Sequence, residues 1–71
     1  MYKFAKRLNP ADSVEIIDIL RGTKAVAKLC DCTPAAVSQW RSKGIPKDRL
    51  LFLRERFKDL AVMNKPEVRE L

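Results

Sequence analysis

The side chains that could do chemistry are few, and the most informative of them lie in one stretch, TPAAVSQW, at residues 33–40. The amide Gln39 follows the hydroxyl Ser38 there, and Ser42 comes shortly after. Glutamine can form two hydrogen bonds with adenine, serine can donate or accept, and alanine can contact the methyl group of thymine. The stretch therefore predicts a surface that reads the edges of bases.

Other kinds of chemistry lack the residues that they need. The chain has no histidine, the usual general base near neutral pH, and no glycine-rich phosphate loop. Cys30 and Cys32 are the only cysteines. Two thiols cannot complete a four-ligand zinc site, and a disulfide across one residue would be strained. We therefore expect reduced structural thiols, no catalysis, no metal or other cofactor, and no small-molecule ligand.

The charge of the chain indicates a polyanionic partner. Fifteen Lys and Arg against nine Asp and Glu give a formal net charge of +6 over 71 residues, which is the length of one domain. No apolar stretch approaches the roughly 18 residues of a membrane helix, and the N-terminus lacks the apolar region of a signal peptide. We therefore expect a cytoplasmic protein that binds nucleic acid and no membrane.

Four helices are predicted, at about residues 10–20, 23–30, 34–43 and 46–60. Pro10 suits the first position of the first helix, with Asp12 and Glu15 as an alternative start, and Gly22 suits the left-handed position after it. Thr23 and Thr33 are expected to cap the second and third helices through their hydroxyls. These two helices, joined by a turn of about three residues around Asp31, have the spacing of a helix-turn-helix.

The fourth helix should begin at Pro46 and bury a stripe of four apolar residues: Leu50, Leu53, Phe57 and Leu60. Phe52 falls on a different face, which indicates a second contact surface. We expect one domain over residues 1–71, with the motif at 23–43 and with flexible segments at 1–8 and 62–71. The start of the chain, where Tyr2 and Phe4 alternate with basic residues, could be a loose tail, a strand, an extra helical turn or a basic arm that contacts DNA.

A helical projection of residues 33–43 separates two faces. Val37 and Trp40 cluster on the side expected to be buried, and the opposite side gathers Ala35, Ser38, Gln39 and Ser42. Basic residues that could contact phosphates flank this outward face: Lys24, Lys28, Arg41 and Lys43. The sequence thus predicts a helix whose outer face reads bases while its neighbours hold the DNA backbone.

The stretch GTKAVAKLCDCTPAAVSQWRSKGIP resembles the helix-turn-helix of Cro-type repressors from lambdoid phages and prophages, in particular the all-helical branch and the related YdaS-like domains. Ala27 matches the small position where the helices cross, whereas Asp31 stands where the family usually has glycine. The resemblance implies a compact all-α domain of four to five helices with a lambda-repressor-like fold. It also implies that Pro34, Ala35, Ser38, Gln39 and Ser42 face the bases and that Thr23, Lys24 and Thr33 contact the backbone.

Three functions compete at this point. The first is a sequence-specific repressor that inserts the helix at 34–43 into the major groove of a pseudo-palindromic operator. The second is an antitoxin-like regulator of a toxin pair, and the third is a helical protein-interaction module that does not bind DNA. For the repressor we expect a homodimer that is weak when free and tighter on DNA, because one such helix reads only a few base pairs. Its contact would come from apolar residues of the C-terminal half: Phe52, Phe57, Val62, Met63 and Leu71.

Overall fold

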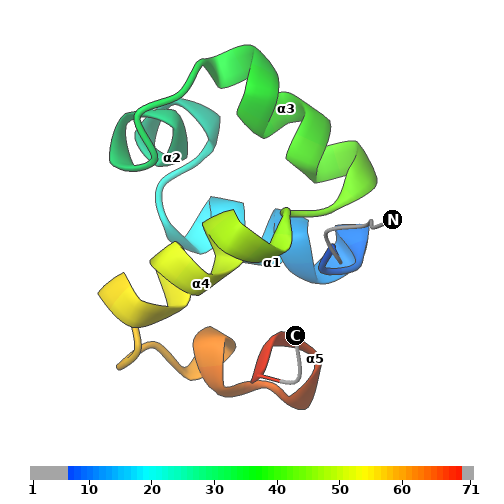
Figure 1. Cartoon of the computed structure of the whole chain (residues 1–71), viewed down its shortest axis with the longest axis vertical. Helices are drawn as coiled ribbons and strands as arrows, with labels where there is room; N and C mark the ends of the chain where they lie inside the picture. The colour runs from blue at the N-terminus through cyan, green and yellow to red at the C-terminus, as the bar shows by residue number, and fades with distance from the viewer. Residues whose placement is uncertain (1–6, 70–71) are drawn as a thin grey trace.

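The computed structural model describes residues 7–69 and shows a small all-α domain (Figure 1). The elements in chain order are α1 (Pro10–Ile19), α2 (Thr23–Leu29), α3 (Pro34–Lys43), α4 (Lys47–Arg56), the 3₁₀ helix η1 (Ala61–Asn64) and α5 (Pro66–Arg69). α3 packs against both α1 and α2, and η1 packs against α5 and α1. The predicted all-α class is therefore confirmed. None of the described helices is long and apolar enough to cross a membrane.

The starts of α1 and α3 follow from local side-chain chemistry. The Asn9 side chain accepts a hydrogen bond from the Asp12 N–H at 2.8 Å, and Pro10 occupies the first helical position. Thr33 does the same for α3, because its hydroxyl oxygen accepts from the Ala36 N–H at 3.2 Å. The expectation for Thr23 was wrong. Gly22 is the N-cap of α2, and no side chain caps that helix.

Two non-glycine residues with left-handed backbone end α1 and α2. Arg21 has φ 84° and Asp31 has φ 55°. In each case the next residue donates its N–H back to the last full turn, from Gly22 to the Ile17 carbonyl at 2.8 Å and from Cys32 to the Ala27 carbonyl at 2.9 Å. The left-handed turn at Asp31 was predicted. After α1, however, Arg21 takes the position expected for glycine, at a conformational cost of about 1–2 kcal/mol.

The N-terminal segment fastens the turn between α3 and α4. Arg7 forms an isolated antiparallel bridge with Pro46, and the Leu8 N–H donates to the Ile45 carbonyl at 3.0 Å. Ser13 is a fully buried polar side chain, and its hydroxyl donates to the Asn9 carbonyl at 2.8 Å and accepts from the Ile45 N–H at 2.9 Å. Because Leu8 is buried at 2% exposure, the flexible N-terminal segment expected at 1–8 does not extend to it.

The core lies between all of these elements and includes the predicted Val37 and Trp40, at 0% and 6% exposure. Trp40 is thus a core residue and not a platform for stacked bases. The buried apolar set consists of Leu8, Ile16, Ile17, Leu20, Val26, Ala27, Cys30, Val37, Trp40, Ile45, Leu50, Leu53, Val62, Met63 and Val68.

The chain after α4 differs most from the sequence expectation. α4 begins one residue after Pro46 and ends at Arg56, not near Leu60, because residues 57–60 turn so that Phe57 and Leu60 pack against the core. Val62, Met63 and Val68 are then buried, and the Arg54 guanidinium donates to the Val68 carbonyl at 3.0 Å. Val62, Met63 and Val68 are therefore packed into the core, and Val62 and Met63 do not offer surface for a dimer. Leu71 lies outside the described residues.

Candidate nucleic-acid interface

The outward face of α3 is short, uncharged and exposed. Burial of Val37 and Trp40 fixes the rotation of the helix about its own axis. All five residues expected to face bases are then exposed: Pro34, Ala35, Ser38, Gln39 and Ser42. α3 runs along one edge of the molecule, away from the C-terminal elements (Figure 1). This arrangement leaves one side of the helix open to a large partner.

Within this face the polar groups differ in what they already bind. The Ser42 hydroxyl donates to the Gln39 carbonyl at 3.2 Å, so its proton is engaged within α3 while its oxygen can still accept. The Gln39 side-chain amide makes no hydrogen bond with any described residue. An exposed amide offers a donor and an acceptor side by side, which is the pair that adenine needs in the major groove.

Charged groups lie on both sides of this face. Lys24 and Lys28 are exposed on α2, and Lys43 is exposed in the last turn of α3. Thr23 is half-buried at the start of α2, and the exposed Thr33 uses its hydroxyl oxygen as the cap of α3. The lysines make no ion pair with any described residue, so their charges are available to an anion.

Arg41 is placed differently from the lysines. It donates to Asp18 of α1 in an ion pair of 2.9 Å, with the two side chains 34% and 58% exposed. Nothing in the sequence indicated this pair, which joins residues 23 positions apart. Because the pair neutralises much of its charge, Arg41 is a weaker candidate for a phosphate contact than Lys43. Its main effect is to join α3 to α1.

Sequence reasoning did not assign Arg7 to this end of α3. Its guanidinium donates to the Gly44 carbonyl at 2.9 Å, directly after Lys43. A cation at the carboxyl end of a helix complements the helix dipole. Arg7 is exposed and adds positive charge beside Lys43. The other basic and aromatic residues at the start of the chain, Tyr2 to Lys6, lie outside the described residues.

The two cysteines contribute to packing. Both are free thiols, Cys30 buried and Cys32 half-buried. Burial raises the pKa of the Cys30 thiol above its ordinary value, the charge of Cys32 raises it further, and Arg49 opposes the shift. Within residues 7–69, no group of three or more His, Cys, Asp or Glu could hold a metal ion. Cys30 therefore stays protonated and unreactive near neutral pH.

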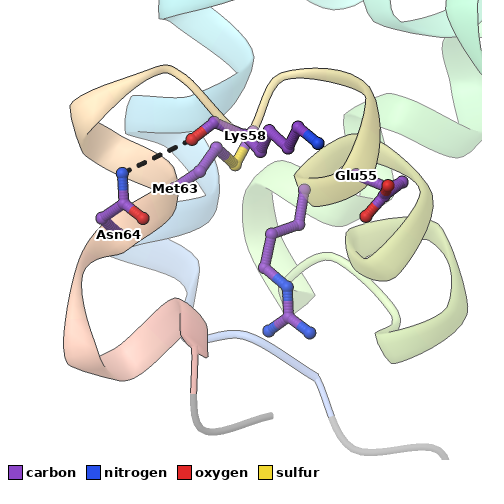
Figure 2. A pocket seen from close by; sticks show the side chains of 5 residues that line it. Glu55, Lys58, Met63 and Asn64 are labelled. Atoms are coloured by element: carbon purple, nitrogen blue, oxygen red, sulfur yellow. Dashed lines mark hydrogen bonds between the residues drawn. The ribbon is translucent and has the colours of Figure 1, made fainter.

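A hollow of about 420 Å³ lies where the C-terminal elements fold back on α4 (Figure 2). It is lined by Arg54, Glu55, Lys58, Met63 and Asn64. The Asn64 amide donates to the Lys58 carbonyl at 3.5 Å and to the Leu60 carbonyl at 3.3 Å. These hydrogen bonds hold in place the turn by which the chain reverses after α4. We interpret the hollow as a space left by the packing of this turn and not as a binding site.

Comparison with known proteins adds no relative, because no family model, no curated protein and no solved structure matches the chain.

Proposed function

We propose that the protein is a sequence-specific double-stranded DNA-binding regulator of transcription, a Cro-like repressor in its mode of action. In this proposal α2 and α3 act as a helix-turn-helix, and α3 enters the major groove. The observation that carries the proposal is the outward face of α3, on which five small or uncharged residues are exposed above a buried Val37 and Trp40. A face without long charged side chains allows the helix backbone to approach base edges closely.

The role of each residue in the outward face of α3 follows from the hydrogen bonds or apolar contacts that its side chain can make. Gln39 pairs with adenine through the carbonyl oxygen and the NH2 group of its side-chain amide, Ser38 donates to or accepts from a neighbouring base, and Ala35 contacts a thymine methyl group. Lys24 and Lys43 bind phosphates on either side. The net charge of +6 adds a long-range attraction that speeds association and does not depend on the base sequence.

The protein acts as a homodimer on a pseudo-palindromic operator, weakly associated when free and more firmly associated on DNA. The half-sites lie about 34 Å apart, one turn of the double helix. α4 supplies the contact between the copies, because Leu51 and Phe52 remain 39% and 45% exposed on it. This replaces the contact expected from Val62 and Met63, which are buried.

The proposal is tested by selecting bound sites from random double-stranded DNA and by measuring affinity as a function of salt concentration. A palindromic consensus should emerge, and Gln39→Ala should weaken specific binding by about 1–3 kcal/mol and relax the preference at one base pair in each half-site. An unchanged consensus with this variant would show that Gln39 is only a surface residue.

The salt dependence separates backbone contacts from base contacts. Lys24→Ala and Lys43→Ala should each weaken cognate and random DNA alike and reduce the slope of log affinity against log salt by about one. Lys58→Ala is the matched control, because Lys58 is an exposed lysine of the hollow behind α4. If no DNA is selected and binding to random DNA is absent at about 50 mM salt, the proposed function is wrong.

A further inference from the structure

A second surface of the protein is an apolar groove of about 510 Å³, and no residue of α3 lines it. Its walls come from the end of α1, from α2 and from the turn after α4. The residues that define it are Ile19, Arg21, Lys28, Leu29, Phe57 and Leu60, and we call it the α1–α2 groove. Ile19 at its edge is 47% exposed, although it is a large hydrophobic residue. An exposed apolar surface of this kind indicates a binding site for another molecule.

The charged residues of the groove are all cationic. Of the described residues that line it, Arg21 and Lys28 are the charged ones, and both are exposed. Neither forms an ion pair or a side-chain hydrogen bond with any described residue. The Arg56 guanidinium carbon lies 5.3 Å from the centre of the Phe57 ring, which brings a third cation to the same wall. The groove therefore combines an apolar floor with a basic rim.

The backbone at Arg21 supports a role for this rim. Arg21 adopts φ 84°, a left-handed conformation that glycine adopts without strain, and it ends α1 beside Ile19. Strained residues of this type are concentrated at functional sites. The chain tolerates the strain at a position that brings a guanidinium to the edge of the groove.

We propose that the α1–α2 groove docks an amphipathic helix of a partner protein, with apolar side chains on the buried face and carboxylates along its edges. Apolar residues spaced i, i+3 or i+4, and i+7 would contact Ile19, Leu29 and Leu60, as in other complexes in which a helix lies in a groove. The carboxylates pair with Arg21, Lys28 and Arg56. A small ligand fits less well, because such ligands bind where most of their surface is enclosed, and Ile19 is almost half exposed.

The proposal is independent of DNA binding by α3, and it is tested with the ¹⁵N-labelled full chain by nuclear magnetic resonance. The probe is a synthetic helical peptide with leucines at i, i+4 and i+7 and glutamates flanking them. One control peptide replaces the glutamates with lysines, and the other replaces the leucines with serines. We expect the acidic peptide to shift resonances of residues 19–29 and 57–60, and both controls to bind at least about tenfold more weakly.

Variants separate binding from folding. Arg21→Gly relieves the left-handed strain, so the variant remains folded while its affinity for the acidic peptide falls severalfold. Arg21→Glu reverses the charge and should weaken binding by about tenfold or more. Ile19→Ser should also weaken it, whereas Ala61→Ser, at an exposed residue of η1 that does not line the groove, should leave it unchanged.

Several outcomes would overturn the proposal. Binding unaffected by Arg21→Glu would remove the charge argument, and shifts confined to α3 or to Phe52 would place the peptide elsewhere. Groove resonances that shift with protein concentration in the absence of peptide would mean that a second copy of the chain covers the groove. Shifts at Arg21 and Lys28 on addition of double-stranded DNA, with none on addition of peptide, would assign the cations to DNA.

Discussion

The close approach of Gly44 to the N-terminal segment makes a sharp prediction about stability. Gly44 has φ 101°, and a Cβ at this position would overlap the Leu8 carbonyl oxygen, which is a backbone atom and cannot turn aside. Gly22 has a similar φ of 95°, but a Cβ there would meet no atom within 4 Å. Gly22→Ala is therefore a matched control that has the same backbone strain without the collision.

The magnitudes of the two substitutions follow from these contacts. Each variant pays about 1–3 kcal/mol for the disfavoured backbone conformation. Gly44→Ala must in addition displace Leu8, which loses its hydrogen bond to Ile45, worth about 1 kcal/mol, and part of the roughly 1.5–3 kcal/mol of its side-chain burial. The extra loss is about 2–4 kcal/mol. A single core of this size rarely supplies more than about 3–5 kcal/mol in total, so Gly44→Ala should be largely unfolded at room temperature.

Urea titrations of both variants, followed by circular dichroism and by the fluorescence of the buried Trp40, measure the difference. Gly22→Ala should unfold cooperatively with a lowered midpoint, while Gly44→Ala should show little or no folded baseline. Equal midpoints for the two variants would refute the reasoning, because they would show that Leu8 can move away from a Cβ at position 44 without a loss of folding free energy.

Three further substitutions test the core and its polar contacts. Trp40→Ala should cost about 3–5 kcal/mol and leave the chain largely unfolded by circular dichroism; a folded variant that had lost only DNA binding would instead place Trp40 at the DNA. Ser13→Ala should cost about 1–3 kcal/mol in urea unfolding, because it leaves the buried Ile45 N–H without an acceptor; a loss below about 0.5 kcal/mol would contradict this. The raised pKa of Cys30 means that the unfolded chain loses this proton first, so stability should fall as the pH rises above the ordinary thiol value of 9.0, and Cys30→Ala should reduce that decline.

The parts of the fold that could be predicted from sequence are those determined by neighbouring residues. Pro10, Pro34 and Thr33 mark helix starts through local geometry and capping, and the structure places all three as expected. The exposed face of α3 was also predictable, because the spacing of Val37 and Trp40 alone sets which side of the helix is buried.

The features that could not be predicted from the sequence depend on contacts between residues that are distant along the chain. The Arg41–Asp18 ion pair and the Ser13–Ile45 hydrogen bond join positions 23 and 32 residues apart, and no local pattern encodes them. The end of α4 was missed for a related reason. The spacing of Phe57 and Leu60 is compatible with a continued helix, and only the burial of the residues that follow favours the turn.

The contact of Leu8 with Ile45 also has a consequence for the order of events on the ribosome. Synthesis proceeds from the N-terminus at about 5–20 residues per second, so the partner of Leu8 is joined to the nascent chain about 2–7 s after Leu8 itself. During that interval α1 can form its own turns, but Ile45, whose N–H donates a hydrogen bond to the Ser13 hydroxyl in the finished domain, has not yet been added. α1 therefore cannot complete its contact with the turn after α3 until Ile45 has been added to the chain.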